Sequence, residues 1–166
     1  MLQFPKNTKA KLSHVNPRSE KHGETLIPAL DLRLEIETGN DVLAQLDPKL
    51  PATFYETRQA QLNGVPRVAD NAELKFPHLD PSGKWDEESE GYRLVLDYGL
   101  GGKNSSIELS NCKVHKIGWV SKQGGTVSIS FTASSTHDLT PAKVGTLGMN
   151  VQHDVYLQLD PPKVSS

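Results

Sequence analysis

The sequence predicts a mainly β protein, folded as a single antiparallel β-sandwich or a partly open barrel with two short helices. Apolar and polar residues alternate at positions 30–36, 92–98 and 127–133, which is the period of a strand with one buried face. Glycine-rich segments separate the later runs, as turns between neighbouring strands require. The helical patterns, at residues 41–46 and 142–147, are short and are bounded by Pro or Gly.

The first 24 residues show no sustained period and contain several breakers, among them Pro5 and Pro17. We expect a basic, extended or loosely held arm at residues 1–24, a single β-rich domain at residues 25–160 and a frayed end at residues 161–166. Within the domain, residues 30–36 form the clearest strand. Its polar face is fully charged, which is typical of an antiparallel sheet with one side in water.

Asn40 follows this strand and is expected to cap a short helix at Asp41–Leu46. Thr140, followed by proline, predicts the start of a second helix at Ala142–Leu147. Both helices are expected to accompany the sheet rather than to form a layer of their own.

Residues 49–90 are rich in proline and glycine, and their course is left open. A second helical turn within residues 49–61 and a short strand at residues 74–76 are the local structures that their pattern allows. Residues 63–90 hold most of these breakers, and an excursion of that length between strands is more often functional or partly mobile than idle.

Residues 92–133 predict a β-meander. Between Val114 and Ile117 the apolar alternation slips by one residue, which predicts a β-bulge. Gly124 and Gly125 supply the positive φ angles of a tight turn before the last strand of the meander.

Composition restricts the class of protein. Apolar residues make up 36% of the chain and charged residues 23%, and no apolar run approaches the length of a membrane span. No apolar segment follows the lysines near the N-terminus, as a secretory signal would require. We therefore expect a soluble, cytoplasmic protein with no membrane partner.

The residues that could carry chemistry do not form a known motif. The six histidines form no HxH or HxxxH pair, and one cysteine is too few for a structural zinc site, so we expect no metal and no cofactor. No G-x-S-x-G motif is present. Cys112 and His115 are three residues apart on a predicted strand, which places them on opposite faces unless the bulge intervenes. We expect no catalytic residues and no enzymatic activity.

Charge is distributed unevenly along the chain. Residues 1–24 hold five basic residues against two acidic ones, and Lys103 follows a glycine-rich turn. Basic residues in such segments are candidates for contact with phosphates. The candidate nucleic-acid-binding residues are Lys6, Lys9, Lys11, Arg18, Lys21, Lys103, Lys116 and Lys122.

Residues 80–97 are the acidic part of the chain, with six acidic residues against two basic ones. Trp85 lies among them with no periodic reason to be buried, and an exposed tryptophan usually marks a contact surface. The candidate protein-binding residues are Trp85, Asp86, Glu87, Glu88 and Glu90.

Two segments carry a resemblance to small, poorly characterised proteins encoded by tailed bacteriophages and prophages. They are Asn16-Pro17-Arg18-Ser19-Glu20-Lys21-His22-Gly23 and Asp97-Tyr98-Gly99-Leu100-Gly101-Gly102-Lys103. The resemblance spans most of the chain and transfers no functional residue. It implies a DNA-handling role in replication or recombination, or a role in blocking a host defence complex.

We therefore expect a non-enzymatic binding protein in the cytoplasm of a bacterial host cell. Our first hypothesis is single-stranded DNA binding in replication or recombination, although a net charge of −2 weakens it. The second is an anti-CRISPR type of role, in which the acidic segment inhibits a bacterial nucleoprotein defence complex by occupying a basic nucleic-acid channel. A homo-oligomer is left open.

Overall fold

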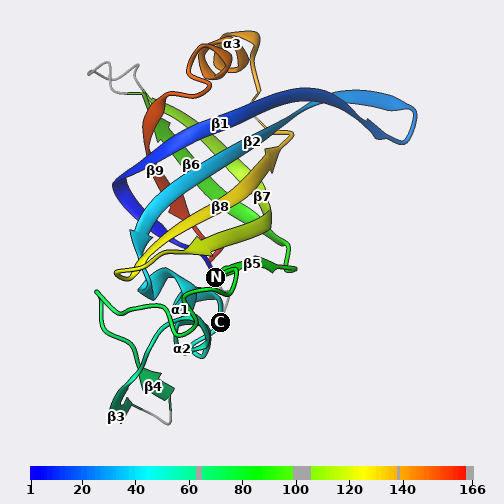
Figure 1. Cartoon of the computed structure of the whole chain (residues 1–166). Coiled ribbons are helices and arrows are strands. Elements are labelled where there is room, and N and C mark those ends of the chain that lie inside the picture. The colour runs from blue at the N-terminus through cyan, green and yellow to red at the C-terminus, as the bar shows by residue number, and fades with distance from the viewer. Residues whose placement is uncertain (63–64, 99–105, 138, 164–166) are drawn as a thin grey trace. The chain divides into compact units, whose positions relative to one another are not determined.

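The computed structural model describes residues 1–62, 65–98, 106–137 and 139–163. The described part is mainly β, as predicted (Figure 1). Its strands are β1 (Phe4–His22), β2 (Thr25–Gly39), β3 (Arg58–Leu62), β4 (Val65–Arg67), β5 (Ser82–Trp85), β6 (Ser89–Asp97), β7 (Ser106–Ser121), β8 (Thr126–Ser135) and β9 (Asp154–Asp160). Its helices are α1 (Asp41–Leu46), α2 (Leu50–Phe54) and α3 (Pro141–Met149).

Seven strands form one antiparallel sheet in the order β5-β7-β6-β9-β1-β2-β8, and β8 also pairs with β7. This additional pairing turns the six strands β7-β6-β9-β1-β2-β8 into a ring, with β5 as an appended edge strand. Of the two predicted architectures, a sandwich and a partly open barrel, the strand order supports the barrel. Strands β3 and β4 form a separate two-stranded sheet.

Alternation along the strands separates an inner from an outer face of the ring. On β2, Leu30, Leu32 and Leu34 are 0% exposed, whereas Asp31 and Arg33 between them are partly exposed. Burial of each leucine stabilises the fold by about 1.5–3 kcal/mol. Polar residues at the alternate positions therefore point to the outer face.

Residues 4–22, which we expected within an extended or loosely held arm, form strand β1. It pairs with β9 from Phe4 to Lys11 and with β2 from Lys11 to His22. Two register shifts and Asn7, at a φ of 67°, interrupt the alternation of its side chains. The sequence therefore shows no sustained period, even though the backbone pairs with β9 or β2 over most of its length.

The predicted bulge on β7 lies where the alternation slips. Lys116, between the buried Val114 and Ile117, adopts a φ of 52°. Its carbonyl oxygen accepts a hydrogen bond of 2.5 Å from Arg33 on β2. A second slip, at Asn111 with a φ of 51°, coincides with a register shift against β6. The bulges explain how one strand keeps its apolar side chains inside the ring over 16 residues.

Two helices match the predicted positions, and α2 lies within residues 49–61, where the pattern allowed a second helical turn. α1 has the predicted bounds, but the Asn40 side chain does not cap it and instead donates to Ala69 O at 2.8 Å. The Thr140 hydroxyl caps α3 by accepting from Lys143 N–H at 3.2 Å. Leu74 makes only an isolated bridge with Tyr55, in place of the short strand that residues 74–76 allowed.

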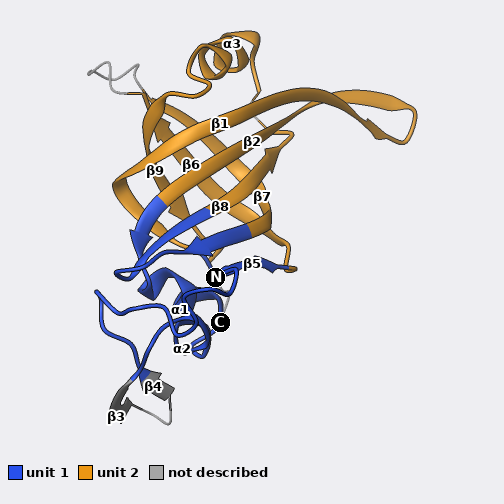
Figure 2. Ribbon diagram, in the orientation of Figure 1, with its two compact units in different colours: residues 1–2, 37–85, 118–129 blue, residues 3–36, 86–117, 130–166 orange. Residues whose placement is uncertain are grey.

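The backbone groups into two compact units (Figure 2). One comprises residues 1–2, 37–85 and 118–129, and the other comprises residues 3–36, 86–117 and 130–166. The expected single domain at residues 25–160 stays a prediction, and of the end expected to fray, residues 164–166 lie outside the described part. None of the described helices has the length and apolar character needed to cross a membrane.

Candidate functional site

A polar pocket of about 340 Å³ lies in the second unit, on the outer face of the ring. Its lining residues come from β1, β2, β6, β7, the end of β8 and the two residues that follow β8. We call it the outer-face pocket. It is lined by Arg18, Glu20, His22, Asp31, Glu90, Asn111, Lys113, His115, Ser134, Ser135, Thr136 and His137.

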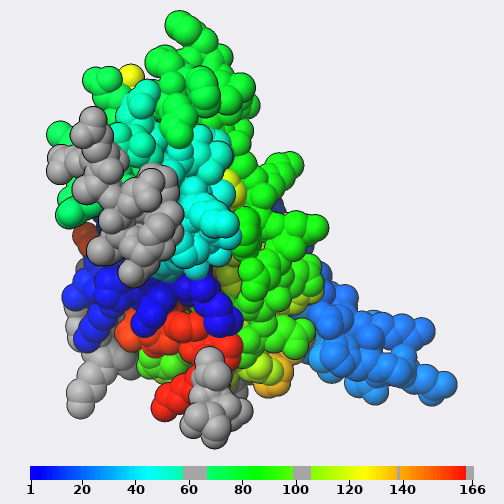
Figure 3. Space-filling view, turned by 90° about the horizontal axis from the view of Figure 1, so that it is seen from below, coloured from blue at the N-terminus to red at the C-terminus, as the bar shows by residue number. Residues whose placement is uncertain are grey.

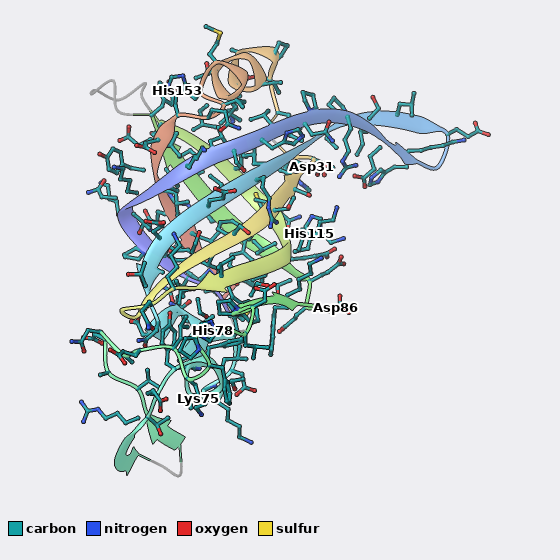
Figure 4. All side chains as sticks on the ribbon, in the orientation of Figure 1. Asp31, Lys75, His78, Asp86, His115 and His153 are labelled. Atoms are coloured by element: carbon teal, nitrogen blue, oxygen red, sulfur yellow. The ribbon has the colours of Figure 1, made fainter. Side chains whose placement is uncertain are left out.

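A hydrogen-bonded chain of three side chains crosses the floor of this pocket, between the two residues labelled Asp31 and His115 in Figure 4. Ser134 Oγ lies 2.6 Å from Asp31 Oδ1 and 2.8 Å from His115 Nε2. The hydroxyl has one proton, and the ionised carboxylate can only accept it. The Ser134 oxygen therefore accepts from His115, which must carry a proton on Nε2.

This order differs from that of a nucleophilic triad, in which histidine lies between the serine and the carboxylate and removes the serine proton. Here Ser134 lies between the other two, and its proton points to Asp31. The thiol of Cys112 is buried, which raises its pKa to about 11, so it is protonated at neutral pH. The geometry of these groups is that of a hydrogen-bonded support for the strands.

Two ionic groups on β1 join the same network. Arg18 donates from Nε to Asp31 Oδ2 at 2.8 Å and from Nη1 to Glu20 Oε2 at 2.9 Å. Glu20 Oε1 lies 2.8 Å from His22 Nε2. Burial opposes ionisation of Asp31, but the hydrogen bonds from Arg18 and Ser134 outweigh it and lower the pKa of this carboxyl group.

Among the side chains of this network that form ion pairs, that of His115 is the least exposed, with an exposed fraction of 13%. Burial and, after it, the neighbouring Lys113 lower its pKa, although Glu88 opposes them from 3.9 Å. Across the described residues, no group of three or more His, Cys, Asp or Glu side chains is placed to hold a metal ion. The expectation of no metal and no cofactor stays a prediction.

The predicted nucleic-acid-binding residues that the structure describes lie on several elements and in both units. Lys6, Lys9 and Lys11 are exposed on the first part of β1, and Lys9 pairs with Asp154 at 3.5 Å. Of the others, Arg18 lines the outer-face pocket, Lys21 lies near the β1–β2 turn, Lys116 lies at the β7 bulge, Lys122 pairs with Glu37 in the first unit, and Lys103 lies outside the described residues.

Sequence reasoning did not select Tyr156. It lies on β9 directly opposite Lys9 of β1, and it is 42% exposed. The signal was present in the chain, because Val155, Leu157 and Leu159 alternate with it and all point inward. An exposed aromatic ring beside a lysine can stack on a nucleic-acid base while the lysine contacts a phosphate.

The predicted protein-binding residues divide between the units. Trp85 ends β5 in the first unit and is half-buried, whereas we expected it exposed in a loop. Asp86, Glu87 and Glu88 follow it in the second unit and are exposed. Glu88 forms an ion pair with Lys113, in which Oε2 lies 3.0 Å from Nζ, and Glu90 lines the outer-face pocket.

No protein-family model matches this chain, and no curated protein or solved structure shows significant similarity to it.

Proposed function

We propose that the chain is a non-enzymatic protein that binds single-stranded DNA on the outer face of strands β1 and β9. The observation that supports this best is the position of Tyr156, exposed and opposite Lys9, with Lys11 two residues further along the same face. Figure 3 shows the start of β1, in blue, beside β9, in red. We call this set of residues, with Lys6, the β1–β9 surface.

The chemistry of this surface suits single strands. Lysines neutralise phosphates, and an exposed aromatic ring offers a platform for a base of any sequence, with stacking worth about 1–3 kcal/mol per base. Lys9 and Lys11 are two residues apart on one face of β1, about 6.6 Å along the strand, and Lys6 is exposed on the other side of the irregularity at Asn7. A strand of DNA lying along β1 can therefore meet all three side chains.

Carboxylates on the same face compete with phosphates. Asp154 pairs with Lys9, and Glu35 lies opposite Lys11 in the register with β2. Binding of a phosphate must break or share these contacts. We therefore expect a modest affinity that falls steeply with salt, with a slope of about −2 in log K against log salt for three phosphate contacts.

Fluorescence anisotropy of a labelled single strand, at two salt concentrations, tests the proposal. Replacing Tyr156 by Ala should weaken binding about tenfold or more, whereas Tyr156→Phe, which keeps the ring, should bind like the original protein. Lys11→Ala should reduce the salt slope by about 0.7. No binding at low salt, or equal binding by Tyr156→Ala and the original protein, would disprove the proposal.

A second candidate is a protein-binding inhibitor of a bacterial nucleoprotein defence complex, working in the cytoplasm of the host of a phage or prophage. The observation that favours it is the run of three exposed acidic residues, Asp86, Glu87 and Glu88, between β5 and β6. Such a run can imitate the phosphates of a nucleic acid towards a basic channel.

Charge reversal at these acidic positions separates the two candidates. Asp86→Lys and Glu87→Lys should abolish inhibition of a purified defence nuclease under the second candidate and should leave DNA binding by the β1–β9 surface intact. Glu88 is kept, because it pairs with Lys113 in the fold. Inhibition that survives the charge reversal would remove the acidic run as the contact.

A further inference from the structure

The second half of β1 has an edge that no strand covers. Among the described residues β1 neighbours only β9 and β2, and its register with β9 ends at Lys11. From His14 to His22 it pairs with β2 alone, in the part of the hairpin that extends beyond the ring in Figure 1. An uncovered edge of this length is a template for pairing with another strand.

The register determines which backbone groups point to this edge. Leu12 N–H donates to His153 O at 3.1 Å, and Leu12 O accepts from Gln152 N–H at 2.7 Å, so both groups of Leu12 point away from β2. Its partner Leu34 therefore belongs to a pair that exchanges no hydrogen bonds. Because this property alternates along β2, it recurs at every second residue from Leu34 towards the turn.

Counting along β2 from Leu34 reaches three pairs of the same kind near the hairpin end. They are Pro17 with Leu30, Ser19 with Pro28, and Lys21 with Leu26. Pro17 and Pro28 thus lie at positions where a backbone N–H would not bond to the other strand of the hairpin, so the missing N–H breaks no hydrogen bond. Their positions support this assignment of the pairs. It follows that Pro17, Ser19 and Lys21 direct their backbone groups to the uncovered edge of β1.

We propose that this edge pairs antiparallel with the same edge of a second copy of this chain, with Ser19 opposite Ser19. The two Ser19 residues exchange two N–H···O bonds, and Lys21 N–H donates to the carbonyl of Pro17 on the other copy, once on each side of the symmetry axis. The dimer contains a continuous four-stranded ribbon, β2-β1 of one copy followed by β1-β2 of the other.

Charge complementarity fixes this register. Centring the pair on Ser19 places Arg18 directly opposite Glu20 of the partner subunit, on both sides of the axis. Centring it on Arg18 or on Glu20 places like charges opposite each other, which is destabilising, and centring it on Pro17 loses both central hydrogen bonds. The sequence Arg18-Ser19-Glu20 is thus self-complementary in the antiparallel direction.

A proline scan tests the edge without disturbing the hairpin. Ser19→Pro removes the central N–H from the uncovered edge and leaves the bonds between β1 and β2 unchanged. It should raise the dimer dissociation constant about tenfold or more in sedimentation equilibrium. Leu26→Pro, the matched control, removes an N–H from the opposite edge of the same hairpin and should dimerise like the original protein.

Cysteine cross-linking tests the register. Opposed residues of a hydrogen-bonded pair have Cα atoms about 5.5 Å apart, within the range of a disulfide, so Ser19→Cys should cross-link on mild oxidation. Lys21→Cys is the control, since the two copies of residue 21 are offset by four residues, about 13 Å, which is too far. The buried native Cys112 does not interfere. A protein that remains monomeric at millimolar concentration, or equal cross-linking at both positions, would overturn the proposal.

Discussion

The two long hairpins of the sheet end in turns of opposite character. The β1–β2 turn contains Gly23, at a φ of 66°, and no atom lies within 4 Å of the position that a Cβ would occupy there. The β7–β8 turn contains Gly125, at a φ of 88°, where a Cβ would lie 1.9 Å from Asp70 O. One turn needs glycine only for its backbone angle, and the other also needs it for space.

Neighbouring contacts explain why the β7–β8 turn is fixed. Tyr55, which is 0% exposed, places its hydroxyl 2.8 Å from Lys122 O and 2.9 Å from Thr126 O, and it accepts from Lys122 N–H at 3.0 Å. Gln123 Oε1 accepts from Leu74 N–H at 2.6 Å. These partners belong to the same unit as the turn. The long excursion between β2 and β6 therefore has a structural role, which is to hold this turn.

The largest effect is expected at Gly125. Gly125→Ala forces an L-residue into the left-handed region and a methyl group against the Asp70 backbone, so it should lower the free energy of unfolding by about 2–5 kcal/mol. Gly124→Ala is the matched control, with a φ of 86° but open space around its Cβ, and should cost only about 1–2 kcal/mol. Urea unfolding measures both. Equal losses would mean that Asp70 does not pack against this turn.

The next effect is expected at the Tyr55 hydroxyl. Tyr55→Phe keeps the ring buried but removes the hydroxyl, whose one proton is shared between Lys122 O and Thr126 O, so it should cost about 1–3 kcal/mol. Tyr156→Phe removes an exposed hydroxyl and should change stability by less than about 0.5 kcal/mol. A loss at Tyr55→Phe as small as that at Tyr156→Phe would show that the Tyr55 hydroxyl does not stabilise the β7–β8 turn.

The hydrogen-bonded chain of Asp31, Ser134 and His115 contains groups that titrate in acid, whereas Tyr55 at the β7–β8 turn titrates in alkali. The pKa of His115 is lower in the folded protein than in the unfolded chain, where it is about 6.5. The contribution of neutral His115 to stability is therefore complete above about pH 6.5 and is lost as pH falls below that value. In Asp31 the pKa is also lowered, and its contribution is lost below about pH 3.9. Burial raises the pKa of Tyr55, so that contribution is lost only as pH rises above about 10.

Unfolding measured at several pH values therefore separates the chain of Asp31, Ser134 and His115 from the contacts of Tyr55 at the β7–β8 turn. The free energy of unfolding should fall as pH drops below about 6.5, and His115→Gln should flatten this part of the curve. Tyr55→Phe should leave the slope of the acid part unchanged and alter the slope only in the alkaline part. If His115→Gln keeps the full slope below pH 6.5, another histidine is responsible for it.

Local patterns predicted the parts of the fold that depend on neighbouring residues. The strand at residues 30–36, the bounds of α1 and the bulge before Ile117 follow from alternation and from Pro and Gly positions. Strand β1 did not, because Asn7 and two register shifts disrupt its period. Pairing with β2 and β9 sets its course, and such pairing is a property of the whole sheet.

The outer-face pocket could not be predicted for a related reason. Ser134 lies 19 residues from His115 and 103 from Asp31 along the chain, and no short motif connects positions so far apart. The strand order β2-β8-β7 brings them together on one face. Charge counts along the sequence likewise missed that Arg18 is paired with Asp31 and Glu20, and that Lys122 is paired with Glu37.

The smallest effect is expected at the open β1–β2 turn. Gly23→Ala meets no neighbouring atom, so only the backbone angle opposes it, and it should cost about 1 kcal/mol. Gly23→Asn should cost less, because asparagine tolerates the left-handed region better than other L-residues do. Urea unfolding of the two variants gives the difference. A loss at Gly23→Ala as large as that at Gly125→Ala would mean that the β1–β2 turn is packed against something in solution, as a hairpin covered by a second molecule would be.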